Sequence, residues 1–167
     1  MNCQNCGAPM KLVRDRDYFA CEYCGSFHFP TPSTQGVRSL RQDSGVSCPA
    51  CHRELELASV EGRRVLHCPN CQGLLSKRPA FLRIVREQRN RAQTPPNPPR
   101  PLDRTELART LLCPFCDRQM DTHPYYGPGN VVIDSCMHCG LIWLDFGELG
   151  IIVSAPGADR PWRLEWG

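Results

Sequence analysis

The chain has 167 residues and a formal net charge of +3, and 41% of its residues are hydrophobic by a count that includes twelve cysteines. Sixteen prolines and thirteen glycines interrupt the rest, so one large hydrophobic core is not expected. No apolar run approaches the roughly 18 residues that a membrane helix needs, and no signal peptide precedes Cys3. The sequence therefore predicts a cytoplasmic protein without a membrane span.

The cysteines form six Cys-x-x-Cys pairs, separated by 14, 23, 16, 41 and 19 residues, with none left over. A disulfide within such a pair closes a tiny loop and stabilises little, whereas two thiolates at this spacing chelate a metal ion. Short and long gaps alternate, so consecutive pairs are expected to share one tetrahedral zinc ion. Sharing by alternate pairs is the less favoured alternative. The expected ligands of three zinc ions are Cys3, Cys6, Cys21, Cys24, Cys48, Cys51, Cys68, Cys71, Cys113, Cys116, Cys136 and Cys139.

The first unit spans residues 1–30 and is followed by a linker over residues 31–45. A polar break at residues 14–17 separates two short strand segments, Leu12-Val13 and Tyr18-Phe19. Residues that tolerate a positive φ follow the second cysteine of most pairs, which predicts a sharp turn around each metal. They are Gly7, Gly25, His52, Asp117 and Gly140, while Gly73 comes two residues after Cys71.

The second unit spans residues 46–92. Alternating residues around Leu55 and Leu57, then the turn Glu61-Gly62, predict a β-hairpin. Ser76 and Pro79 signal the start of a helix that runs from about Pro79 to Arg91. Its apolar side carries Phe81, Ile84 and Val85, and its basic residues are Lys77, Arg78, Arg83, Arg86, Arg89 and Arg91. This basic face is either merely solvated, or it contacts an acidic protein or a phosphate backbone.

A proline-rich linker over residues 93–108 leads to the third unit, residues 109–154. A turn at residues 127–130 precedes an apolar strand, and Asp145 with Glu148 resembles a capping box at the start of a second helix. Trp143 is expected to pack between hairpin and helix. The tail, residues 155–167, contains Trp162 and Trp166, which either dock on a ribbon or anchor a partner.

Three segments of the third unit carry a family resemblance: Cys113-Pro114-Phe115-Cys116, Cys136-Met137-His138-Cys139-Gly140 and Ile142-Trp143-Leu144-Asp145-Phe146-Gly147-Glu148-Leu149. With them this unit resembles the bacterial zinc ribbon named after transcription factor IIB. The second unit resembles the family more loosely, and the first resembles a generic short zinc ribbon. The second and third units also resemble each other, because Phe81, Ile84 and Val85 match Leu149, Ile152 and Val153.

The resemblance implies a small, metal-stabilised fold of three tandem zinc ribbons. Each ribbon is a short antiparallel β-hairpin with a four-cysteine zinc site, and short helices follow ribbons 2 and 3. Structural zinc contributes roughly 10–16 kcal/mol to such small folds, so the metal-free chain is expected to be largely unfolded.

Charge and chemistry narrow the expected function. Residues 37–104 carry a net charge of +7 and residues 105–167 one of −4. Three divalent ions bound by twelve thiolates bring the whole chain to about −3, which weakens a general nucleic-acid interpretation. Four thiolates also close each site to catalysis. We expect His52, His67 and His138, which lie at or near the cysteine pairs, not to replace a thiolate.

The sequence therefore predicts a non-enzymatic zinc-binding adaptor with a macromolecular partner and no small-molecule substrate. A protein partner is slightly favoured over nucleic acid. One alternative is a nucleic-acid-binding or transcription-associated protein that acts through residues 77–91. A second alternative is a thiol-based redox or zinc sensor.

Overall fold

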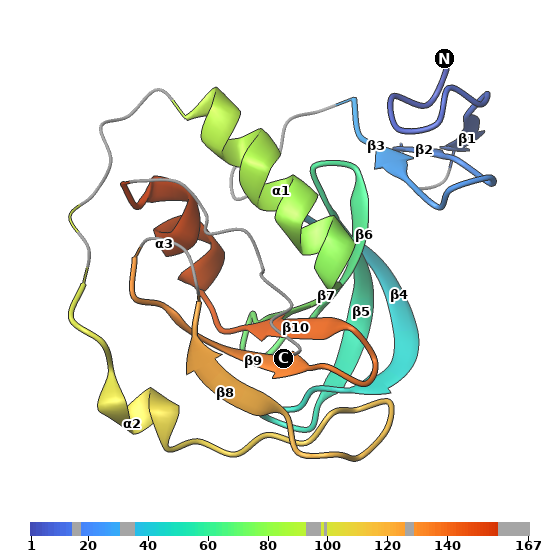
Figure 1. Cartoon of the computed structure of the whole chain (residues 1–167). Helices are drawn as coiled ribbons and strands as arrows, with labels where there is room; N and C mark the ends of the chain where they lie inside the picture. Colours follow the sequence, from blue (N-terminus) through green and yellow to red (C-terminus); the bar gives the residue numbers. More distant parts are fainter. Residues whose placement is uncertain (15–17, 31–35, 93–97, 99, 126–128, 157–167) are drawn as a thin grey trace.

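A computed structural model describes residues 1–14, 18–30, 36–92, 98, 100–125 and 129–156 of the protein. They form a three-stranded antiparallel sheet and a seven-stranded antiparallel sheet, with three helices (Figure 1). Over these residues, every helix is too short or too polar to cross a lipid bilayer. The tail residues Trp162 and Trp166 lie outside the described part of the chain.

The first ribbon contains the three-stranded sheet. Strands β1 (Lys11–Val13), β2 (Tyr18–Ala20) and β3 (Phe27–His28) follow one another in space as in sequence. The first two strands confirm the prediction made on either side of the polar break. Tyr18 and Phe27 are buried and meet edge to face, with 5.5 Å between their ring centroids. Because so few strands bury so little surface, this ribbon depends on its metal site and on its neighbour.

The second ribbon begins the larger sheet with β4 (Val37–Ser47), β5 (Glu54–Val60), β6 (Arg63–His67) and β7 (Leu74–Lys77). The turn at Glu61-Gly62 confirms the predicted hairpin. Helix α1 (Arg78–Arg91) follows directly and buries Phe81, Ile84 and Val85, as its apolar pattern predicts. Ser76 does not cap it, because Lys77 is the N-cap and the Ser76 hydroxyl donates to the Lys77 carbonyl instead.

Strand β4 corrects the expected linker over residues 31–45, because residues 37–45 belong to it. Its sequence is largely polar, since it lies at the edge of the sheet and most of its side chains are exposed. The register against β5 shifts twice, and Arg41 and Gly45 have φ angles of 50° and 72°. Such irregularities protect an edge strand from pairing with other chains.

The third ribbon contains a short helix α2 (Arg104–Leu107), then β8 (Asp121–Pro124), β9 (Val132–Cys136), β10 (Leu141–Leu144) and helix α3 (Glu148–Ser154). Helix α2 lies within the predicted linker over residues 93–108. The Asp103 side chain caps it by accepting hydrogen bonds from the Thr105 and Glu106 amides. The turn expected at residues 127–130 lies partly outside the described residues, and Gly129 and Asn130 have positive φ angles.

The second and third ribbons share one sheet in the order β4-β5-β6-β7-β10-β9-β8. The junction is the antiparallel pair β7–β10, in which Leu75 lies opposite Trp143 and Leu74 opposite Leu144. Both strands follow the last cysteine of their ribbon, so equivalent parts of the two ribbons meet. The two ribbons are therefore halves of one continuous structure rather than separate beads.

The two faces of this sheet hold different cores. Helices α1 and α3 pack together over one face (Figure 1), where Ile84 and Ile152 join Ile142 and Leu144 in a buried cluster. Trp143 belongs to a second cluster with Leu55, Leu75 and the cysteines of the second and third ribbons. The expectation that Trp143 packs between hairpin and helix is thus wrong, since alternate residues of β10 point to opposite faces.

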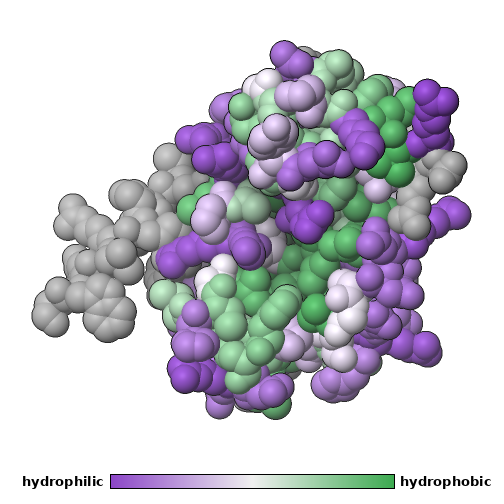
Figure 2. Space-filling view, turned by 90° about the vertical axis from the view of Figure 1, so that its right-hand side faces the viewer, coloured by the Kyte–Doolittle hydropathy of each residue, from purple (hydrophilic) through white to green (hydrophobic). Residues whose placement is uncertain are grey.

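The first ribbon docks on the tip of the β5–β6 hairpin. The Phe27 amide donates to the Gly62 carbonyl at 2.9 Å, and Tyr18 and Phe27 form a buried cluster with Leu40 of β4. The Arg64 guanidinium lies 5.4 Å from the centroid of the Phe27 ring. Figure 2 views the molecule from this side and shows hydrophobic residues in the middle of the face, bordered by hydrophilic ones.

Candidate metal centres

The cysteines gather into three groups of four, one for each ribbon, and the ligand atoms of each group lie within 4.8 Å of one another. Consecutive pairs share a site, which confirms the predicted pairing over the alternative. The groups are Cys3, Cys6, Cys21 and Cys24, then Cys48, Cys51, Cys68 and Cys71, and finally Cys113, Cys116, Cys136 and Cys139.

The distances between sulfurs fit a tetrahedral ion. The Sγ atoms of Cys51 and Cys68 are 3.5 Å apart, and those of Cys116 and Cys136 are 3.6 Å apart. Zinc–thiolate bonds of about 2.3 Å in a tetrahedron place the sulfurs about 3.8 Å apart, whereas a disulfide needs about 2.05 Å. All twelve cysteines are free, so the chemistry of the donor set is that of a closed, structural metal site.

The backbone around each site turns as the sequence predicts. Gly7, Gly25, His52, Asp117 and Gly140 have φ angles between 57° and 77°. Gln72, not Gly73, has the positive φ after Cys71, at 60°. Gly73 is needed for another reason, because a Cβ atom there would come within 2.2 Å of the Trp143 ring. Each turn also directs amide hydrogens at sulfur, as in the 3.4 Å approach of the Cys51 amide to the Cys48 Sγ.

The thiols of one group influence each other's ionisation. The Arg53 amide donates to the sulfur of Cys51 and lowers its pKa to about 6. Burial raises the pKa of Cys71 in the same group, and its neighbouring sulfurs add to this effect. Four thiolates this close repel one another unless a cation lies among them. A divalent ion supplies that charge and would stabilise the thiolate form of the four cysteines.

Histidines do not enter the described four-cysteine groups. His138 lies 3.3 Å from an Arg118 guanidinium nitrogen, and His52 occupies a turn position with a φ of 63°. Burial lowers the pKa of His67. Sequence reasoning missed His123, which is buried and hydrogen-bonds to the Ser135 hydroxyl at 2.9 Å.

A polar network supports the third site from the opposite end of β10. Arg109 pairs with both Asp134 and Asp145, and the Trp143 indole N–H donates to Asp145 at 3.0 Å. The Glu148 carboxylate accepts from the Asp145 amide at 2.7 Å. The predicted capping box is wrong, because Gly147 and not Asp145 is the N-cap of α3, and the helix has no side-chain cap; the Asp145 side chain is held by Arg109 and Trp143 instead. Asp134 is fully buried. Its pairing with Arg109 could not be predicted from the sequence, because the two residues lie far apart in the chain.

Most of the predicted basic residues around α1 have partners within the protein. Arg83 donates to Asn5 at 3.1 Å, Arg89 donates to the Ile152 carbonyl at 2.6 Å, and Arg91 pairs with Glu61 at 2.5 Å; Arg78 also has a partner. Lys77, Arg83, Arg86 and Arg91 are nevertheless exposed, and Arg78 and Arg89 are half-buried. The basic face is therefore only partly available to a partner.

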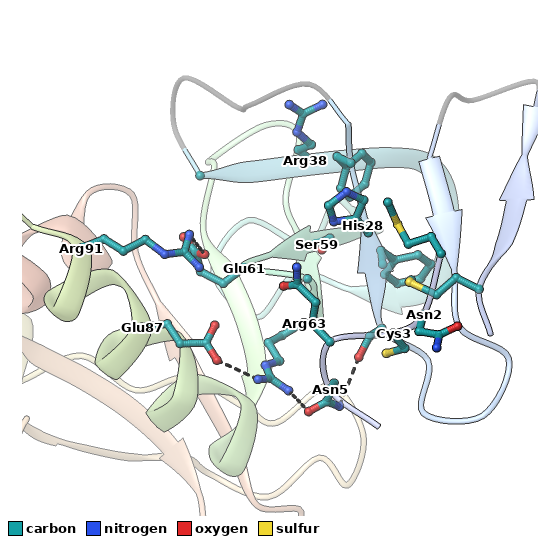
Figure 3. A pocket seen from close by; sticks show the side chains of 18 residues that line it. Asn2, Cys3, Asn5, His28, Arg38, Ser59, Glu61, Arg63, Glu87 and Arg91 are labelled. Atoms are coloured by element: carbon teal, nitrogen blue, oxygen red, sulfur yellow. Dashed lines mark hydrogen bonds and ion pairs between the residues drawn. The ribbon is translucent and has the colours of Figure 1, made fainter. Parts of the chain in front are cut away.

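A cleft of about 670 Å³ separates the first ribbon from the β5–β6 hairpin and α1 (Figure 3). One arginine crosses it, because Arg63 donates to Asn5 at 2.5 Å and to Glu87 at 2.8 Å. Asn5 lies between two cysteines of the first site, Cys3 and Cys6. Asn5 thus links a knuckle of the first metal site to the second ribbon, in addition to the contacts of Phe27 and Tyr18.

Two family models match the chain. Residues 1–83 match the model described as a double zinc ribbon, and residues 112–155 match the model described as a transcription factor zinc-finger, of the transcription-factor-IIB type. Neither the curated proteins nor the solved structures gave a match. With a four-cysteine group in each ribbon, these families indicate three zinc ions. The chain is a tandem zinc-ribbon protein, in which a double zinc ribbon is followed by a ribbon of the transcription-factor-IIB type.

Proposed function

We propose that the protein is a non-enzymatic adaptor, whose twelve cysteines hold three structural zinc ions and whose surface binds another protein. The observation that carries this proposal is that several basic residues around α1 contact other parts of the same chain. Arg83, Arg89 and Arg91 serve contacts within the chain. Because these guanidinium groups are engaged within the described part of the chain, fewer cations of α1 are available to a phosphate backbone, which favours a protein partner.

Closed metal sites support the non-enzymatic part of the proposal. Catalytic zinc keeps a coordination position open for water or substrate, whereas four thiolates fill a tetrahedral ion. Each described group offers four sulfurs. The ions then stabilise the fold, and the surface that the fold presents performs the function.

The experiment is an affinity pull-down with zinc-loaded, full-length protein, performed with and without nuclease. The adaptor proposal expects a stoichiometric protein that resists nuclease. Recovery that depends on intact nucleic acid would overturn it. Charge reversal of an exposed α1 cation away from the sheet junction, Arg86→Glu, separates the interpretations further. It should weaken binding to a phosphate backbone and lower the salt dependence of that binding, whereas capture of a protein partner should persist.

A second candidate, a zinc or redox sensor, has one observation in its favour. Cys6 and Cys24 of the first site are exposed, whereas the partly accessible cysteines of the other two sites are half-buried. Thiolates that solvent reaches are oxidised and lose metal first. A sensor would release its first zinc reversibly under mild peroxide while the other two ions stay bound.

A further inference from the structure

The knuckles of the third site expose two large apolar side chains. Phe115 lies between Cys113 and Cys116, and Met137 between Cys136 and Cys139. Their exposed fractions are 57% and 56%. The Sγ atoms of Cys116 and Cys136 are 3.6 Å apart, so the two knuckles that carry these residues lie side by side at the same metal site.

The second ribbon serves as an internal control, because it is built on the same plan in the same sheet. Its residues equivalent to Phe115 and Met137 are Ala50 and Pro69, and both are exposed. The zinc-ribbon fold therefore tolerates alanine and proline at the positions of Phe115 and Met137. The apolar pair in the third ribbon is not required for folding, and exposed apolar residues that a fold does not need point to contact with a partner.

Cations lie beside the two knuckles that carry this pair. Arg118 is exposed on the first knuckle and contacts His138 of the second. The sheet junction brings two more, since Lys77 lies opposite Leu141 and the Arg78 amide donates to the Gly140 carbonyl at 2.9 Å. Arg78 and Met137 line the same small hollow of the surface. The two knuckles themselves carry one acid, Asp117, and one cation, Arg118, so Lys77 and Arg78 provide the excess of positive side chains at the rim.

We propose that Phe115 and Met137, with Lys77, Arg78 and Arg118 around them, form a docking surface for an acidic, apolar segment of a partner protein. This proposal rests on the proposed adaptor function and specifies its partner. The apolar pair provides the contact that excludes water, and the cations select a segment with Asp or Glu beside its apolar residues. The β7–β10 junction assembles the surface, because it joins the start of α1 to the third metal site.

The test selects random twelve-residue peptides displayed on phage against zinc-loaded, full-length protein. The peptides recovered are synthesised with a fluorescent label, and their affinities are measured by anisotropy. We expect them to combine acidic residues with Leu, Phe or Trp. Selection without enrichment of acidic residues, or no selection at all, would overturn the docking surface.

Two double variants locate the binding. The variant F115A/M137P installs the residues of the second ribbon, and K77E/R118E reverses two cations without touching the apolar pair. Each is expected to weaken binding at least about tenfold, while Tyr23→Ala, which removes an exposed aromatic from a knuckle of the first ribbon, leaves binding unchanged. Native mass spectrometry checks that three zinc ions remain bound. If F115A/M137P loses zinc, the affinity of K77E/R118E alone decides whether this surface binds the peptides.

Unchanged affinity in both double variants would overturn the surface. This failure is distinguishable from failure of the adaptor proposal, which is tested by the pull-down alone. A nuclease-resistant partner that both variants still capture would leave the adaptor standing and move its binding site elsewhere.

Discussion

Leu75 and Trp143 lie directly opposite each other in the pair β7–β10, and each is the fourth residue after the last cysteine of its ribbon. Equivalent residues that face each other across an antiparallel pair mark a local two-fold axis, as in a symmetric dimer. Here both halves belong to one chain, and helices α1 and α3 follow the same symmetry on the other face. The junction buries this pair between the second and third metal sites.

The close approach of Trp143 to Gly73 gives the first prediction. A Cβ atom at position 73 would lie 2.2 Å from the Trp143 ring and 3.0 Å from the Leu144 carbonyl oxygen. Because Trp143 is fully buried and cannot move freely, Gly73→Ala should lower the free energy of unfolding by about 1–3 kcal/mol. Urea denaturation of the zinc-loaded protein measures this.

Gly150→Ala is the matched control. Gly150 lies in α3, and a Cβ atom there meets nothing within 4 Å. Because alanine favours helix over glycine, this change should be neutral or stabilise by up to about 1 kcal/mol. Equal stability of the two variants would show that the Trp143 contact does not constrain position 73.

The shared core predicts that the second and third metal sites are coupled. Cys139→Ser removes a ligand of the third site, and loosening of that half removes support from the β7–β10 junction. The second site should then bind zinc about tenfold more weakly. Chelator competition followed by native mass spectrometry measures the affinity. Cys6→Ser in the first site is the control, and an equal effect of both substitutions on the second site would contradict the coupling.

Glu148 predicts a pH dependence of stability. Burial raises its pKa in the folded protein to about 8 from an ordinary value of 4.5; the carboxylates of Asp145 and Glu106 add to this, while the hydrogen bond from the Asp145 amide and the charge of Arg109 oppose it. Between these two pH values the folded state holds a proton that the unfolded chain has released. The contribution of Glu148 is therefore fully present below about pH 4.5 and is lost as the pH rises through about 8.

Glu148→Gln should remove this dependence, since the amide oxygen still accepts from the Asp145 amide but does not titrate. The test compares the free energy of unfolding of the two proteins at saturating zinc between about pH 5 and pH 9. Both proteins contain the same twelve thiols, so their contribution cancels when the free energy of unfolding of one protein is subtracted from that of the other. Wild type should lose stability relative to the variant as the pH rises, and parallel curves would rule out a proton on Glu148.

The hydrogen bonds to Asn5 predict that this side chain helps to hold the first ribbon on the second. Its side-chain oxygen accepts from Arg63 at 2.5 Å and from Arg83 at 3.1 Å. Asn5→Ala leaves both guanidinium groups without this acceptor and should weaken docking by about 1–3 kcal/mol. Hydrogen exchange at the Phe27 amide, which donates to Gly62, reports on docking. Gln4→Ala on the same knuckle is the control, and protection equal to wild type in Asn5→Ala would mean that the apolar cluster alone holds the ribbon.

Local sequence patterns predicted the parts of the fold that depend on nearby residues. Cysteine spacing predicted which pairs share a site, and the apolar positions of α1 predicted its buried side. Strand β4 was missed, because an exposed edge strand with mostly polar residues resembles a linker. The face on which Trp143 lies and the link between Arg109 and Asp134 both arise from contacts between residues far apart in the chain, and no local pattern carries them.

The central claim is that metal ions organise this chain, and the count of bound zinc tests it most directly. Native mass spectrometry of purified protein, with elemental analysis of the same sample, should give three zinc ions per chain and no disulfide. Removal of the ions with a chelator should also abolish the folded state. A folded, metal-free protein, or cysteines joined as disulfides, would contradict the account.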